Sequence, residues 1–281
     1  MRETRRVGRS RQYWSGMARG TGGAILFSLP TLMTMELWQL GFYAGRLRLV
    51  LFLVLAIPLL IGLSHYSGLR PTTGWVGETT DALSAYGIGF VTSAVTLFLF
   101  GVVDLTDAPP DVVGKIALEA VPAAFGAVIA QSQMGQRSGA RQRQKAERER
   151  HVGYWGELFL MACGAVYLAL SVAPTQEMVL IAFKMNPGRA VALAGVSVGL
   201  LHAFVYALQF SGQESAPPGT PGWSLLLRFT VVGYAIALLF SAYILWTFGR
   251  FDGTSPAWMI AESVVLGLPA SVGAAAARLI L

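Results

Sequence analysis

Four glutamates lie within otherwise apolar stretches of the chain, where a carboxyl group can bind a proton or a cation. Glu119 is the most deeply placed of them, within the apolar run 112–133. A charge near the middle of a membrane costs about 2.5–3.5 kcal/mol on insertion scales, so charged residues at this depth usually have a function. Pro122 follows three residues later and removes one backbone hydrogen bond. Together they predict an interrupted helix with an acid beside it, the arrangement that transporters use to bind ions.

The other candidates for an ion path are two acids, a proline and a histidine in other apolar runs. They are Glu36, Glu262, Pro269 and His202. Glu36 and Glu262 are expected at the same outer depth as Glu119, where three carboxylates could form one cation or proton site. Each acid could instead hydrogen-bond a neighbouring helix or reach the interface. For Glu262, which lies early in its run, we favour that structural role.

Acidic residues also follow two of the apolar runs, Asp104 and Asp107 after one and Asp252 after another. On the outer surface, a negative mouth would concentrate cations. The same positions are rich in Thr and Ser, which together with Asp are typical of helix caps. We favour capping, with an outer mouth as the alternative.

The elements that carry these residues are expected to be transmembrane helices. Hydrophobic residues make up 54% of the chain and charged residues 13%, with a mean hydropathy of +0.56, values far from those of soluble proteins. Runs of roughly 20 apolar residues, the length needed to cross a bilayer, occur at 22–40, 46–65, 82–103, 112–133, 154–174, 188–210, 224–249 and 257–280.

An internal repeat organises these runs. SAVTLFLFGVVDLT (93–106) and SAYILWTFGRFDGT (241–254) share S-A-x-x-L-x-x-F-G-x-x-D-x-T, and the segments beginning at Pro122 and Pro269 also match. The first and fifth runs share little beyond Gly23 and Gly156. The pattern predicts an all-α membrane protein of eight transmembrane helices, built as two parallel-oriented four-helix repeats.

Basic residues set the expected orientation and the boundaries of the parts. The predicted order is a basic amino terminus (1–21), a first repeat (22–134), a basic linker (135–153) and a second repeat (154–281). Since Lys and Arg are enriched on cytoplasmic flanks, both termini and the linker are expected to be cytoplasmic. The linker either sets topology alone, the reading we favour, or also binds anionic lipid through Arg137, Arg141 and Arg143.

Several chemistries are not expected. The histidines lack the spacing of a zinc site, and phosphate-binding glycine motifs do not occur, so we predict no metal site, no cofactor and no enzymatic activity. Nucleic-acid binding is not expected because aromatic residues are not interleaved with the arginines. The segment 66–81 could be re-entrant, although an interfacial loop anchored by Trp75 is favoured.

The repeated motif, the Arg-rich amino terminus and the basic linker resemble a family of bacterial integral membrane proteins known only as a domain of unknown function. The resemblance implies a bacterial inner-membrane location and identifies no site residue. From the residues themselves we predict a channel or secondary transporter for a cation or protons, assembled as a homo-oligomer. The alternative is a non-transporting membrane scaffold or sensor whose Arg-rich segments bind lipid or a partner protein.

Overall fold

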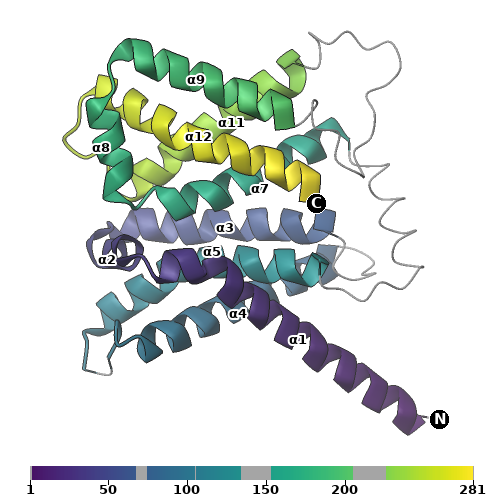
Figure 1. Ribbon diagram of the computed structural model, residues 1–281. Coiled ribbons are helices and arrows are strands. Elements are labelled where there is room, and N and C mark those ends of the chain that lie inside the picture. The colour runs from purple at the N-terminus through teal and green to yellow at the C-terminus, as the bar shows by residue number, and fades with distance from the viewer. Residues whose placement is uncertain (1, 68–74, 105, 134–152, 205–225, 281) are drawn as a thin grey trace, which may run out of the picture. The chain divides into compact units, whose positions relative to one another are not determined.

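The structure is a computed structural model that describes residues 2–67, 75–104, 106–133, 153–204 and 226–280. The elements in these ranges are all helices (Figure 1), which confirms the expected all-α fold class. The chain divides into two compact units, Met1–Lys145 and Ala146–Leu281. The boundary between the units falls inside the linker that the charge pattern places at 135–153.

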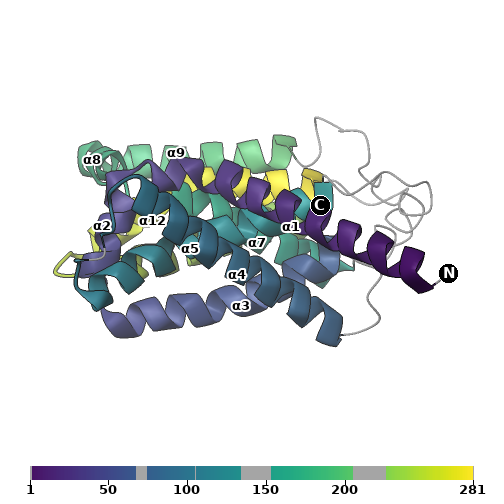
Figure 2. The ribbon, with the colours of Figure 1, turned by 90° about the horizontal axis from the view of Figure 1, so that it is seen from below.

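The first unit is built around its last helix, α5 (Pro109–Gln133). The other helices are α1 (Arg2–Leu32), α2 (Met35–Tyr43), α3 (Arg46–Ser67) and α4 (Trp75–Leu99). All four pack against α5, and Figure 2 shows α5 between α1 and α3. Consequently α5 is buried over most of its length, whereas α3 is largely exposed to its surroundings.

Small residues let α1 and α5 approach closely. A Cβ atom on Gly23 would overlap the side chain of Ala130 and lie 2.7 Å from the carbonyl oxygen of Gly126. A Cβ atom on Gly126 would lie 2.7 Å from the carbonyl oxygen of Gly23. Membrane helices commonly pack through such small-residue contacts, because lipid offers no hydrophobic drive for larger side chains to meet.

The second unit is likewise built around its last helix, α12 (Pro256–Ile280). It contains α7 (Tyr154–Val172), α8 (Gln176–Lys184), α9 (Pro187–His202), the π-helix η2 (Leu226–Val231) and α11 (Val232–Thr247). Helix α12 packs against α7, α8, α9 and α11 (Figure 1). At its crossing with α7, a Cβ atom on Gly273 would overlap the backbone of Gly164, so this crossing also requires glycine.

Six helices in the described residues are long and apolar enough to cross a membrane. They are α3, α4, α5, α7, η2 with α11, and α12. The expected continuous helix at 22–40 is wrong, because α1 ends at Leu32 and α2 begins at Met35. Thr34 between them has extended backbone angles. The run expected at 188–210 corresponds to α9 as far as His202, and its last residues lie outside the described part.

Candidate functional site

The core of the first unit contains a glutamate. Glu119 lies in the middle of α5, three residues before Pro122, and its side chain is completely buried. Its neighbours along α5, from Ala117 to Val121, are also buried and otherwise apolar. Since α5 is enclosed by α1, α2, α3 and α4, the helices bring this carboxyl group into an apolar interior and not to a lipid-facing surface.

Among the described residues, neither carboxyl oxygen of Glu119 has a partner at hydrogen-bond geometry. The hydroxyl-bearing side chain beside the carboxyl group is that of Thr31 on α1. However, the Thr31 hydroxyl donates its proton to the carbonyl oxygen of Ser28, at 2.8 Å, and Ser28 donates to Ala24 at 2.6 Å. A buried polar group without a partner is costly and therefore rare in folded proteins.

An apolar cluster separates Glu119 from the turn between α4 and α5. Its fully buried members are Leu32, Leu97 and Val103, against which Trp38, Val102, Val112 and Ile116 pack. Ile116 lies one helical turn before Glu119 on α5, so the cluster begins next to the acid. The apolar cluster therefore extends from the turn to within one helical turn of Glu119.

The acids expected at the outer mouth hold this turn together. Gly101 has a φ of 68°, which glycine adopts without steric cost. The Asp107 carboxylate accepts a hydrogen bond from the backbone N–H of Asp104 at 3.1 Å and lies 3.7 Å from Lys115 Nζ. Lys115 also donates to the carbonyl oxygen of Val102 at 2.8 Å. These bonds fix the turn through Asp107 while Asp104 is exposed, so the choice between capping and an outer mouth stays a prediction.

In the second unit, the corresponding turn carries Asp252, which is exposed and donates its backbone N–H to Gly249 at 3.2 Å. Arg250 donates from Nη2 to the carbonyl oxygen of Pro174, at the end of α7. The same guanidinium acts electrostatically on Glu262, whose side chain is buried near the start of α12. Among the described residues, Oε2 of Glu262 has no hydrogen-bond partner, so the expected bond to a neighbouring helix stays a prediction.

The remaining candidates lie on other helices than Glu119. Glu36 is half-buried in the first turn of α2 and not inside a long helix. Pro269 lies within α12, as Pro122 lies within α5. His202 closes α9, and its Nδ1 lies 2.9 Å from the hydroxyl oxygen of Thr230 in η2. Glu36 is thus on another helix of the first unit, and Pro269 and His202 belong to the second unit.

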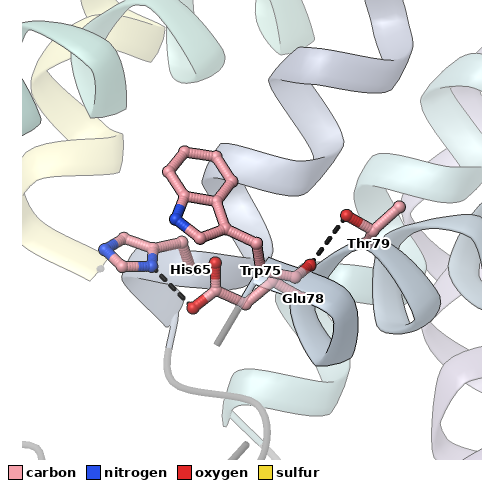
Figure 3. Close-up of polar contacts among 4 residues, drawn as sticks. All are labelled: His65, Trp75, Glu78 and Thr79. Atoms are coloured by element: carbon pink, nitrogen blue, oxygen red, sulfur yellow. Dashed lines mark hydrogen bonds and ion pairs between the residues drawn. The ribbon is translucent and has the colours of Figure 1, made fainter. Parts of the chain in front are cut away.

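A polar pair that the sequence did not single out joins α3 to α4. Figure 3 shows the carboxylate of Glu78 beside the ring of His65, with Nδ1 and Oε1 2.7 Å apart. Helix α4 begins at Trp75, so the second half of the segment 66–81 is helical, while residues 68–74 lie outside the described part. Spacing alone could not reveal the pair, because His65 and Glu78 lie on two different helices.

Comparison with known proteins identifies one family. The model of the family described as "Putative integral membrane protein (DUF2391)" matches residues 16–281. No curated protein and no solved structure matches the chain.

Proposed function

Because the chain belongs to the DUF2391 family of integral membrane proteins, we propose that it is a passive channel or secondary transporter for a cation or protons. One observation carries this proposal, the completely buried Glu119 whose two carboxyl oxygens have no partner. Intramembrane acids are expensive and mark ion and proton pathways in membrane proteins. A carboxyl group with no structural bond has no evident packing role, so transport is the function that best explains it.

Glu119 is the proposed site, and the other acids are proposed to have structural roles. Asp107 is held by Lys115 and by a backbone N–H. Glu262 lies beside the guanidinium of Arg250. A favourable cation gives each of these two carboxylates a structural role that needs no bound ion. Lys115, the cation one turn from Glu119 on α5, is instead bonded to Val102 and lies close to Asp107, so we assign ion binding to Glu119.

We further propose a duplicated architecture with eight membrane crossings, by α1, α3, α4, α5, α7, α9, α11 and α12. Several features of the separate units support it. In each, a threonine at the N-cap position, Thr34 or Thr175, follows a long helix and precedes a helix of nine residues. In each, a glycine with positive φ, Gly101 or Gly249, precedes the last helix. The short helices α2 and α8 then lie at the outer surface between crossings.

The same proposal includes the cellular setting. An even number of crossings per repeat leaves both termini and the linker cytoplasmic, as the positive-inside rule favours. We place the protein in a bacterial inner membrane as a homo-oligomer, with Arg137, Arg141 and Arg143 close to anionic lipid headgroups. We propose no enzymatic role.

The test is ion flux into liposomes that contain the purified protein, measured for H⁺, K⁺, Na⁺, Ca²⁺ and Cl⁻. The proposal predicts flux of a cation that Glu119→Gln abolishes, because glutamine keeps the shape and removes the titratable group. Glu78→Gln is the matched control, since that carboxylate lies in the same unit and already has a partner in His65. Absence of any cation flux in the wild-type protein, or equal loss in both variants, would contradict it.

A further inference from the structure

The face of α1 that meets α5 carries a row of hydroxyl groups. Ser28 and Thr31 lie three residues apart on one side of the helix, and Thr34 follows in the link between α1 and α2. Ser28 and Thr31 are completely buried, while Thr34 is half-buried. Each hydroxyl donates its proton to a backbone carbonyl of α1, at 2.6–2.8 Å.

This bonding leaves the hydroxyl oxygens free to accept. A hydroxyl group has one proton to donate and two lone pairs, and the backbone bonds use only the proton. A water molecule that reaches this face can therefore donate to Thr34, Thr31 or Ser28. Thr31 lies beside Glu119, so the row runs from the helix end at Thr34 to the acid.

The surroundings of Glu119 do not suit a metal cation. Calcium takes six to eight oxygen ligands, and even magnesium requires about six. In the described part of the chain, no three His, Cys, Asp or Glu side chains gather where they could hold a metal ion. Lys115 is one turn away on α5, with its ammonium group bonded to Val102, and its positive charge opposes a second cation nearby. A carboxyl group that takes a proton becomes neutral and needs no further ligands.

In the second unit, apolar residues replace the acid and the two buried hydroxyl groups at the equivalent positions. Under the proposed duplication, residues 20–43 correspond to 161–184 and residues 109–130 to 256–277, with Gly23–Gly126 equivalent to Gly164–Gly273. In that alignment Glu119 corresponds to Leu266, Thr31 to Val172 and Ser28 to Ala169. The acid and the two buried hydroxyls are replaced as a set, which is expected if they serve one purpose.

From these observations we propose that Glu119 binds a proton and not a metal cation, and that water along the hydroxyl row of α1 delivers it. The inference rests on the proposed transport function. In the loading step, an O–H bond breaks in a protonated water molecule and an O–H bond forms at a carboxyl oxygen of Glu119. Release is the reverse, so nothing is oxidised or reduced.

The experiment compares proton flux and metal-ion flux in the same proteoliposomes, with pH-sensitive and cation-sensitive dyes inside. Thr31→Val, the residue found in the second unit, is expected to slow proton flux by about tenfold, the effect of losing roughly one hydrogen bond along the path. Thr247→Val is the matched control, because Thr247 is also fully buried and makes the same kind of bond to its own helix, at 2.9 Å to Tyr243. It should leave the flux within about twofold of the wild type.

A second readout detects the proton directly. The infrared spectrum of the reconstituted protein should contain the carbonyl stretch of a protonated carboxyl group, shifted by deuterium and lost in Glu119→Gln but not in Glu78→Gln. Flux of Na⁺, K⁺ or Ca²⁺ that depends on Glu119 without proton flux would overturn this inference and leave the transport proposal standing. If no ion moves, the transport proposal fails, and the infrared band alone decides whether Glu119 holds a proton.

Discussion

Replacing Glu119 with methionine is expected to make the protein more stable. Methionine has a similar length and fills the same space without polar atoms. An unsatisfied buried polar group costs about 1–3 kcal/mol, and a swap that nearly conserves volume costs less than about 1.5 kcal/mol. Because both oxygens of Glu119 lack partners, the penalty removed should exceed the repacking cost. We expect the free energy of unfolding to rise by about 1 kcal/mol.

The opposite sign is expected for Glu78→Met. That carboxylate lies 2.7 Å from His65 Nδ1, although the His65 side chain is 52% exposed. A hydrogen bond to a charged group contributes about 1.5–3 kcal/mol, and solvent screening reduces this, so a loss of about 1 kcal/mol is expected. Reversible unfolding in mixed micelles, followed by tryptophan fluorescence, measures both. A loss of stability in Glu119→Met equal to that in Glu78→Met would refute the reasoning, because it would mean that Glu119 has a structural partner.

Two further predictions concern packing and topology. Gly126→Ala should lower the free energy of unfolding by about 1–3 kcal/mol through overpacking, because its Cβ would lie 2.6 Å from Phe27 Cβ. Gly87→Ala should not lower it, because no described atom lies within 4 Å of the added Cβ. Thermal unfolding of the two variants checks this. In a Cys163→Ala background, a membrane-impermeant thiol reagent outside the cell should label a cysteine at Thr106 and not one at Arg143, and labelling of both from one side would reject the proposed orientation.

The sequence predicts most helices because apolar runs of membrane length leave few alternatives. The runs expected at 46–65, 112–133 and 154–174 are α3, α5 and α7 with small changes at their ends. The break between α1 and α2 is invisible to hydropathy, since Met33 and Met35 keep the run apolar. A local signal was present nonetheless. Thr34 followed by Glu36 in the next turn is typical of a helix start.

The register between the first helices of the two units could not be found by comparing short segments. The contacts of Gly164 with Gly273 match those of Gly23 with Gly126, so Gly164 and not Gly156 is the counterpart of Gly23 under the proposed duplication. The offset is then 141 for the first pair of helices and 147 for the last. Loops of different length account for the change, and only contacts between helices reveal it.

The sequence was enough to predict that Glu119 is buried, but not which hydrogen bonds its carboxyl group makes. An acid in the middle of an apolar run identifies Glu119 as buried, because the run has to cross the membrane. Whether its oxygens have partners depends on which face of α1 meets α5, and in particular on Thr31 donating to Ser28. The same reason explains why the pairing of Lys115 with Asp107 was not expected, since these residues meet only after the turn has folded.

The most direct test of the central claim is the ratio of cation flux in Glu119→Gln to that in the wild-type protein, in liposomes of matched protein density. We expect a measurable wild-type flux, carried by protons. We expect the flux of the variant to be lower by at least about tenfold, because glutamine lacks the carboxyl group that binds the transported ion. Equal flux in the two proteins, with the variant folded, would contradict the assignment of the passenger to Glu119.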